Sequence, residues 1–262
     1  MRPSSSAPTD HVRVERAAGI VTLTLVRPEK KNALTPEMYA ALAAAIVEAD
    51  QDRETRVVLL EAEGDAFTAG NDLAEFAAAA SDQFPERFGA EPLLEALVLA
   101  RTPIVAAVQG QAVGVGLTLL LHCDLVYVAE NARLSSPFVN LALTPEAASS
   151  LLLPARIGHV RAFALFALGE AIDGRTAAAW GLANAALPAA EVRACARAAA
   201  EALAQRPPAA VAAAKALMRD APAYASRIQE EYEQFRAQLR SPEAHEAFAA
   251  FFEKRAPDFS RF

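Results

Sequence analysis

The sequence predicts an α/β protein with one large core followed by a helical C-terminal region. In residues 12–129, short apolar segments with strand-like patterns alternate with segments of helical periodicity. From Glu146 onward, strand-like segments nearly vanish and the remaining segments have helical patterns. We therefore expect an α/β core over residues 11–200 and a helical region over residues 201–262. Residues 1–10 are rich in Ser and Pro and are expected to form a disordered tail.

The first half of the chain contains most of the expected strands. Residues 12–26 alternate in polarity around Ala18-Gly19, which predicts a β-hairpin. Residues 36–49 predict a helix, because Thr35 can cap its first turn and Pro36 suits its first position. Further buried strands are expected at 57–61, 103–109 and 124–129, and further helices at 85–100 and 115–122.

The second half is expected to consist of helices. Their predicted ranges are 159–168, 174–180, 189–204, 208–219, 223–239 and 242–254. Pro207-Pro208 and Ser241-Pro242 mark breaks between them. The last two helices carry the apolar residues Phe235, Leu239, Phe248, Phe251 and Phe252. These side chains pack either on the chain's own core or on a neighbouring subunit, and the sequence pattern does not distinguish the two.

The composition excludes several functional classes. The net charge is −7 and no basic stripe occurs, which argues against nucleic acid binding. Cys123 and Cys195 are isolated and the four histidines are scattered, so we expect a reducing compartment and no metal site. Residues 103–129 are apolar but interrupted by polar residues and glycines, which favours buried elements over a membrane span. Residues 1–10 lack the pattern of a signal peptide, and we expect a cytoplasmic protein.

The segment FTAGNDL, residues 67–73, follows a predicted strand and contains a sharp turn. One interpretation is a simple connection from a strand to a helix. The other is that free backbone N–H groups face a ligand at a place where small residues allow close approach.

The segment GQAVGVGL, residues 110–117, is a second glycine-rich turn that opens a predicted helix. Its spacing fits neither the dinucleotide-binding fingerprint nor the phosphate-binding loop of nucleotide hydrolases. What remains is a helix start with exposed N–H donors. Together with the first turn it is suited to an oxyanion hole, in which one donor contributes about 3–4 kcal/mol to transition-state stabilisation.

The segment LTPEAASS, residues 143–150, predicts a helix start in which Thr144 caps and Pro145 opens the helix. Its first four residues, Leu-Thr-Pro-Glu, also occur at residues 34–37, where we infer only a helix start. Around Glu146, however, the apolar residues Phe138, Leu141, Leu143 and Leu151–Leu153 predict a desolvated carboxyl with a raised pKa, as a general base requires. No Ser nucleophile motif is present, and His122 is expected to be a core residue.

Taken together, these segments resemble the enoyl-CoA hydratase/isomerase (crotonase) superfamily from about Val12 to Phe259. The matching stretches, in order, are RPEKKNAL (27–34), FTAGNDL (67–73), PIVAAVQGQAVGVG (103–116), HCDLVYVAENARLSSPF (122–138), WGLAN (180–184), RPPAAVAAAK (206–215) and FFEKRAPDF (251–259). The resemblance implies a spiral of ββα units with a helical C-terminal trimerisation region. It also implies assembly as homotrimers or dimers of trimers.

The resemblance assigns roles to particular residues. It implies that the N–H groups of Asn71 and Val115 bind the thioester oxygen of an acyl-CoA, while Gly70 and Gly114 shape the two turns. Coenzyme A is expected near Lys30, Lys31 and the backbone around Ala69, Asp72 and Leu73, with Lys254 reaching a phosphate on a neighbouring subunit. No cofactor is implied beyond the coenzyme A moiety of the substrate.

Two departures favour one reaction of the superfamily. Its hydratases use two glutamates, and Thr118 and Phe138 occupy those positions here. Neither side chain is an acid or base at neutral pH. The chain instead has Glu146 at the position used by a branch that resembles peroxisomal-type Δ3,Δ2-enoyl-CoA isomerases.

The resulting hypothesis is conversion of 3-enoyl-CoA into trans-2-enoyl-CoA, with Glu146 as the single acid and base. The acyl chain is expected in a pocket lined by Phe76, Phe138 and Leu141. Two alternatives stay open: hydration or another crotonase-type reaction with an unusual base, and a non-catalytic oligomer that binds acyl-CoA.

Overall fold

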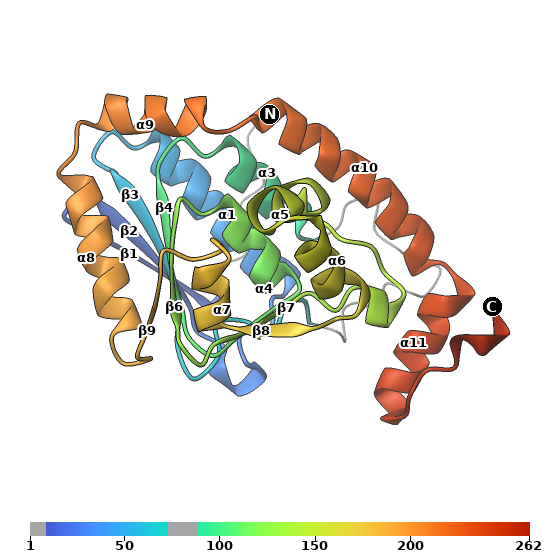
Figure 1. The fold of residues 1–262 in the computed structure, drawn as a ribbon. Coiled ribbons are helices and arrows are strands. Elements are labelled where there is room, and N and C mark those ends of the chain that lie inside the picture. Colours follow the sequence, from blue (N-terminus) through green and yellow to red (C-terminus); the bar gives the residue numbers. More distant parts are fainter. Residues whose placement is uncertain (1–8, 73–88) are drawn as a thin grey trace.

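The computed structural model describes residues 9–72 and 89–262, which form two β-sheets surrounded by helices (Figure 1). The strands are β1 (Val12–Ala17), β2 (Ile20–Leu25), β3 (Val57–Ala62), β4 (Ile104–Val108), β5 (Gln111–Val113), β6 (Leu125–Ala129), β7 (Arg133–Ser135), β8 (Ala171–Asp173) and β9 (Ala185–Leu187). The α-helices are α1 (Pro36–Gln51), α3 (Glu91–Leu99), α4 (Val115–Thr118), α5 (Ser149–Ile157), α6 (His159–Ala167), α7 (Gly174–Ala179), α8 (Val192–Ala204), α9 (Pro208–Leu217), α10 (Ala221–Leu239) and α11 (Pro242–Glu253). Short 3-10 helices are η1 (Pro28–Lys30), η2 (Leu119–His122), η3 (Val139–Leu141) and η4 (Phe259–Arg261).

The larger sheet has six strands in the order β1-β2-β3-β4-β6-β9. β1 and β2 form the predicted antiparallel hairpin, and the other neighbouring strands are parallel. Every residue of β2 and β4 is buried, as expected for strands covered on both faces. In Figure 1, α8 lies on one side of this sheet while α1 and α4 lie on the other.

The smaller sheet has three strands in the order β5-β7-β8. β5 and β7 are parallel, and β7 and β8 are antiparallel. β5 lies within the second glycine-rich segment, directly before α4. This sheet therefore fixes the backbone that leads into the second turn.

The predicted α/β class is confirmed, and so are most of the predicted elements. Thr35 caps α1, because its side-chain oxygen accepts a hydrogen bond from the Met38 N–H. After Glu146 strands nearly vanish, as predicted: the described residues there form two short strands, β8 and β9, which the sequence pattern did not indicate. Each has only three residues, too few for an alternating pattern to be recognised.

The C-terminal helices lie on the outside of the molecule (Figure 1). α10 packs on α3 and α5, and α11 packs on η3. Of the apolar residues singled out in the sequence, Phe235, Leu239 and Phe248 are buried within the chain. Phe251 and Phe252 are each about half exposed. The boundary predicted at residues 200 and 201 remains a prediction.

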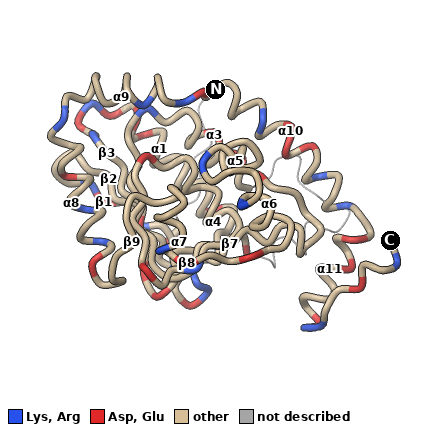
Figure 2. The backbone as a smooth tube through the Cα atoms, in the orientation of Figure 1, with Lys and Arg blue, Asp and Glu red and all other residues tan. Residues whose placement is uncertain are grey.

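Acidic and basic residues are mixed along α10 and in the C-terminal segment (Figure 2). Within residues 9–72 and 89–262, every helix is too short or too polar to span a lipid bilayer. The tail predicted over residues 1–10 lies almost entirely outside the described residues, as do Leu73 and Phe76.

Candidate active site

In the first glycine turn (residues 67–72), the backbone bends sharply at Gly70, whose φ is +91°. A Cβ atom at this position would lie 2.7 Å from the carbonyl oxygen of Val113, so only glycine fits without displacing the neighbouring backbone. Leu34 holds the turn from the other side. Its N–H donates to the Gly70 carbonyl oxygen (2.8 Å), and its carbonyl oxygen accepts from the Asp72 N–H (3.0 Å).

The second glycine turn (residues 110–116) places Gly114 at the start of α4 with a φ of +56°. The Gly114 N–H donates to the carbonyl oxygen of Ser135 in β7 (2.8 Å). Its own carbonyl oxygen accepts from the N–H groups of Leu117 (2.9 Å) and Thr118 (3.0 Å). The smaller sheet and the first turn of α4 thus hold Gly114 between them.

The two glycine turns are hydrogen-bonded to each other. The Thr68 N–H donates to the Gln111 carbonyl oxygen (2.9 Å), and the Val113 N–H donates to the Thr68 carbonyl oxygen (3.1 Å). Among the described residues, no acceptor is present for the N–H groups of Asn71 and Val115. An oxyanion hole requires N–H donors that have no acceptor within the protein, and these two groups meet that requirement within the described residues.

A cavity of about 470 Å³ opens beside both turns. Its described lining residues are Ala69, Gly70 and Asn71 of the first turn, Gln111, Val113 and Gly114 of the second, Pro137, Phe138, Asn140, Leu141 and Leu143 of the following segment, and Phe235, Ala247, Phe251, Arg255 and Pro257 of the C-terminal region. Most of this lining is apolar, which suits an apolar ligand held by a few polar groups. Phe138 and Leu141, which the sequence analysis expected in the wall of a pocket, line this cavity.

Glu146 is buried next to α4, with 5% of the residue exposed. Its Oε1 accepts a hydrogen bond of 2.5 Å from the hydroxyl of Thr118, three residues after Val115. Burial raises the pKa of Glu146 to about 8, and the nearby Glu231 adds to this effect, while the Thr118 hydrogen bond opposes it. The described residues that line the cavity do not include Glu146. Its carboxyl is held at Thr118, the last residue of α4, the helix that starts directly after Gly114.

The predicted helix start at residues 144–146 is wrong. Ala147 and Ala148 have φ values of +64° and +54°, which are incompatible with an α-helix, so α5 begins only after them. The hydroxyl of Thr144 caps nothing: it is buried, and no partner for it occurs in the described part of the chain. Instead of starting a helix, the chain turns and leaves the Glu146 side chain in the interior.

Two further residues of the site were missed by the sequence analysis. Tyr39 of α1 is 2% exposed, and its hydroxyl donates a hydrogen bond to Oδ1 of Asn71. Burial raises the pKa of Tyr39, and the Glu146 charge contributes in the same direction. Glu231 of α10 is also buried, close enough to Glu146 to affect its pKa. In the sequence, Tyr39 resembles any other apolar position of a helix, and Glu231 is one of several acids in an exposed-looking helix.

The predicted coenzyme A contacts begin at η1. Lys30 and Lys31 are exposed, and the Lys31 carbonyl oxygen accepts from the Ala69 N–H (2.9 Å), which places this loop against the first glycine turn. Asp72 has a structural partner in Arg27, whose guanidinium lies 2.7 Å from the Asp72 carboxylate. This pair and the backbone bond to Leu34 stabilise the turn.

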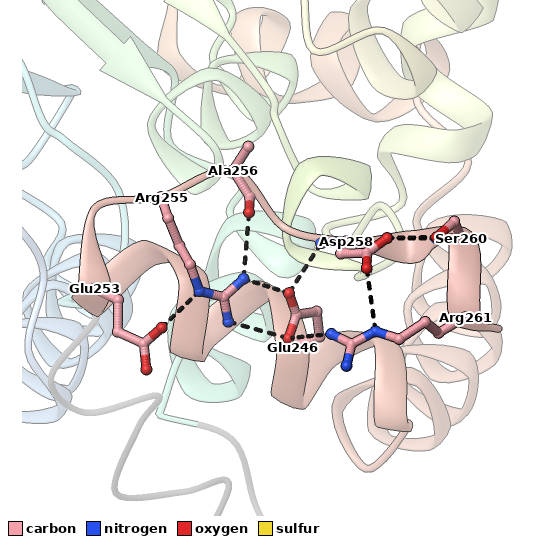
Figure 3. Close-up of polar contacts among 7 residues, drawn as sticks. All are labelled: Glu246, Glu253, Arg255, Ala256, Asp258, Ser260 and Arg261. Carbon is pink, nitrogen blue, oxygen red and sulfur yellow. Dashed lines mark hydrogen bonds and ion pairs between the residues drawn. The ribbon is translucent and has the colours of Figure 1, made fainter.

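The C-terminal segment reaches the cavity through Arg255. Figure 3 shows its guanidinium between two carboxylates: it contacts Glu246 through both terminal nitrogens (2.5 and 3.1 Å) and Glu253 through Nε (2.5 Å). Glu246 also accepts from the Asp258 N–H (2.9 Å), so the segment after α11 is tied back onto the helix. Lys254 is exposed at the end of α11, and its predicted contact with a neighbouring subunit's phosphate remains a prediction.

Within the described ranges, no three His, Cys, Asp or Glu side chains lie close enough together to hold a metal ion. These ranges offer two backbone N–H donors, the buried carboxyl of Glu146 with its raised pKa and a largely apolar cavity. Such a set suits proton transfer next to a carbonyl group whose oxygen is bound by the two donors.

The sequence model of the family described as "Enoyl-CoA hydratase/isomerase" matches residues 15–261, which is nearly the whole chain. The chain belongs to the enoyl-CoA hydratase/isomerase family. The resemblance seen in the sequence is thereby confirmed, and so is the crotonase fold that it implied. This protein is an enzyme of the crotonase type, and an acyl-CoA substrate is consistent with its family.

Individual relatives agree with this assignment. A probable enoyl-CoA hydratase of Rhodobacter capsulatus is 35% identical over 258 residues, which cover 95% of this chain and 97% of that protein. Enoyl-CoA delta isomerase 2 of Rattus norvegicus is 34% identical over 181 residues, which cover 68% of this chain and 46% of that protein. A crystal structure of an enoyl-CoA hydratase/isomerase from Pseudoalteromonas atlantica T6c has a TM-score of 0.90 at 41% identity, with 95% of this chain and 100% of that chain covered.

Both hydratases and an isomerase of the enoyl-CoA hydratase/isomerase family are thus among the relatives. Membership defines the reaction class, but the choice between the two reactions depends on the acid and base groups of this chain.

Proposed function

We propose that this enzyme isomerises a 3-enoyl-CoA to the trans-2-enoyl-CoA. The observation that carries the proposal is the buried carboxyl of Glu146 beside α4, whose pKa burial raises to about 8. Thr118 and Phe138 occupy the positions at which the related hydratases have glutamates. Thr118 donates a hydrogen bond to Glu146, and Phe138 lines the cavity. Neither side chain is an acid or base at neutral pH, which supports a reaction that adds no water.

In the proposed reaction, the N–H groups of Asn71 and Val115 bind the thioester oxygen and stabilise the enolate that forms. Ionised Glu146 removes one proton from C2, and the electron pair of that C–H bond forms the C2=C3 double bond. The former C3=C4 electron pair takes the same proton back from Glu146 at C4. The substrate gains and loses no atoms, so one acid–base group is sufficient.

The remaining parts of the proposal concern binding. We infer that Lys30, Lys31 and the backbone around Ala69, Asp72 and Leu73 bind the coenzyme A moiety. Lys254 would bind a phosphate on a neighbouring subunit of a homotrimer or a dimer of trimers. No further cofactor is required, because the reaction is a proton transfer.

A side-by-side assay of a 3-enoyl-CoA and a 2-enoyl-CoA tests the proposal. We expect the purified enzyme to convert the first faster than it hydrates the second. Predominant hydration would favour the alternative reaction, which the resemblance to the probable enoyl-CoA hydratase of Rhodobacter capsulatus supports. Tight binding of both esters without turnover would favour a non-catalytic acyl-CoA-binding protein.

The oxyanion hole is tested at Val115, the first residue of α4. Proline is accepted at this helix position but lacks the N–H donor. We expect Val115→Pro to lower kcat by about 100- to 1,000-fold. Val115→Ala keeps the donor and removes only buried methyl groups, so it should lower stability and leave kcat within a few-fold. Equal kcat values for the two variants would contradict the assigned donor.

A further inference from the structure

Helix α5 begins without a side-chain cap of its own. Its N-cap is Ala148, and the first N–H groups of a helix have no partner inside that helix. Glu231, on α10, supplies the missing acceptors. Its Oε2 accepts from the Ala148 N–H (2.6 Å) and its Oε1 accepts from the Ser150 N–H (2.8 Å). A residue more than 80 positions away in the sequence thus caps the helix that follows Glu146.

The capped amides adjoin a backbone conformation that is costly for alanine. Ala147 and Ala148 are both left-handed and fully buried. A Cβ atom makes the left-handed conformation unfavourable, so residues other than glycine keep this conformation only where contacts with the surrounding structure stabilise it. The two residues separate Glu146 from α5, and the Ser149 N–H donates to the Glu146 carbonyl oxygen (3.1 Å). The direction of the Glu146 side chain therefore depends on this turn.

Glu231 also acts on Glu146 through its charge. Glu231 is 6% exposed, and its negative charge favours the protonated form of Glu146. The other groups nearby are Tyr39 and Tyr232, whose hydroxyls sense the Glu146 charge, and Arg227, which attracts Glu231. Burial raises the pKa of Glu231, whereas the Ser150 hydroxyl, the two amide donors and Arg227 act in the opposite direction and favour its ionised form.

We propose that Glu231 is a positioning residue: its carboxylate holds the turn at Ala147 and Ala148, and so fixes the Glu146 carboxyl beside the reacting carbons. Its charge keeps a proton on Glu146 between removal at C2 and return at C4. This inference rests on the proposed function, in which Glu146 is the acid and base. It assigns to the C-terminal helical region a part in proton transfer.

Glu231→Gln tests the inference. Glutamine has one acceptor oxygen, so one of the two amides loses its partner, and the negative charge is lost as well. We expect kcat to fall by about 10- to 100-fold while KM changes less than about threefold. The acid limb of the kcat/KM profile should move to lower pH, because Glu146 loses the neighbour that favours its protonated form. Glu231→Asp keeps the charge and should retain the position of that limb.

Glu91→Gln is the matched control. Glu91 contacts Arg236 at 2.6 Å and ties α10 to α3, whereas Glu231 ties α10 to the first amides of α5. We expect this variant to melt at a lower temperature but to keep the wild-type pH profile. The positioning role would be overturned if Glu231→Gln changed neither kcat nor the acid limb of the kcat/KM profile. It would also be overturned if Glu91→Gln shifted that limb by the same amount.

Exchange of the C2 protons separates this inference from the proposed function. A saturated acyl-CoA in D2O, followed by NMR, reports proton removal without isomerisation. If the wild type exchanges the C2 protons but does not isomerise a 3-enoyl-CoA, the proposed function fails. The inference about Glu231 is then tested by the C2 exchange rates of the Glu231 variants. If Glu146→Gln exchanges as fast as the wild type, both the proposed function and the inference fail.

Amide hydrogen exchange of the protein backbone is an independent test. Over residues 145–152 it should accelerate in Glu231→Gln and not in Glu91→Gln. An unaltered rate in Glu231→Gln would also overturn the inference.

Discussion

The tetrapeptide Leu-Thr-Pro-Glu occurs at residues 34–37 and at residues 143–146, and its two copies fold differently. In the first copy, Thr35 caps α1 and Glu37 is exposed in the first helical turn. In the second, no helix follows directly and Glu146 is buried against α4. A hydrogen bond from the Thr35 side chain lowers the pKa of Glu37, whereas burial raises the pKa of Glu146.

The difference arises from the residues that surround each copy. Met38 and Tyr39, after the first copy, continue the helix and bury its apolar face. Ala147 and Ala148, after the second, are left-handed and are held by the carboxylate of Glu231. A local motif thus specifies a helix start only where no distant group imposes another conformation. Both copies nevertheless serve the site, the first through the backbone of Leu34 beside Gly70.

The largest difference between the copies is expected in catalysis. Glu146→Gln removes the acid–base group and should lower kcat by about 100- to 10,000-fold. Glu37→Gln makes the same chemical change in the exposed copy and should leave kcat unaltered. Steady-state isomerase assays measure both. Isomerase activity that survives in Glu146→Gln would remove the functional distinction between the two copies.

The pH dependence of stability should also separate the two glutamates. Since the pKa of Glu146 rises from 4.5 to about 8 on folding, the folded chain holds this proton more tightly than the unfolded chain. That stabilisation is complete below the unfolded pKa and is lost as the pH rises to about 8. As the pH rises from 4.5 to about 8, the free energy of unfolding of Glu146→Gln should therefore increase relative to that of the wild type. The increase should be at most on the order of 5 kcal/mol. Thermal melts at several pH values measure it, and a difference independent of pH would contradict the raised pKa.

A smaller effect is expected from the buried hydrogen bond that Thr118 donates to the second glutamate. Thr118→Val preserves shape but removes the donor to Glu146, so the pKa of Glu146 should rise further. We expect kcat/KM at neutral pH to fall about tenfold and its acid limb to move to higher pH. This shift is opposite in sign to the one expected for Glu231→Gln. A shift in the same direction for both variants would show that the two contacts do not act on Glu146 separately.

The two threonines should respond oppositely to the same substitution. Thr35→Val deletes a helix cap and should reduce the free energy of unfolding by about 1 kcal/mol. Thr144→Val replaces a buried hydroxyl for which the described residues offer no partner, and should raise that free energy by up to about 1 kcal/mol. Denaturant titrations compare the two variants. Destabilisation by Thr144→Val would reveal a polar contact at this hydroxyl.

The smallest effect is expected in the backbone. Ala148→Gly relieves the strain of the left-handed conformation but increases the conformational entropy of the unfolded chain. Because the two effects oppose each other, the free energy of unfolding should change by less than about 1 kcal/mol. Ala44→Gly, at an exposed position inside α1, has no strain to relieve and should destabilise by about 1 kcal/mol. Equal losses in denaturant titrations would indicate that the turn after Glu146 is not strained.

Sequence patterns were sufficient for the longer elements. The hairpin of β1 and β2, the cap of α1 and the ranges of the later helices follow from periodicity and turn residues, which act over a few positions. The three-residue strands β8 and β9 have no such pattern. Their pairing depends on neighbours far away in the chain.

The same distinction applies to the site. The two glycine turns and Glu146 are recognisable because they belong to short segments of fixed composition. Tyr39 and Glu231 are not, because their contacts with Asn71 and α5 cross about 30 and more than 80 residues. A single sequence carries no record of such contacts. The misplaced helix start at residues 144–146 has the same cause, since Glu231 acts on it from α10.

The cavity wall has two origins in the chain. The reacting end is formed by the glycine turns, whereas Phe235, Phe251 and Arg255 belong to the last helices and the segment that Glu246 ties down. Changes at Phe251 and Arg255, which lie after α10, can therefore lengthen, shorten or polarise the proposed space for the acyl group while Glu146 and Glu231 stay in place. Substrate range and bond chemistry are in this way open to separate variation during the divergence of such enzymes.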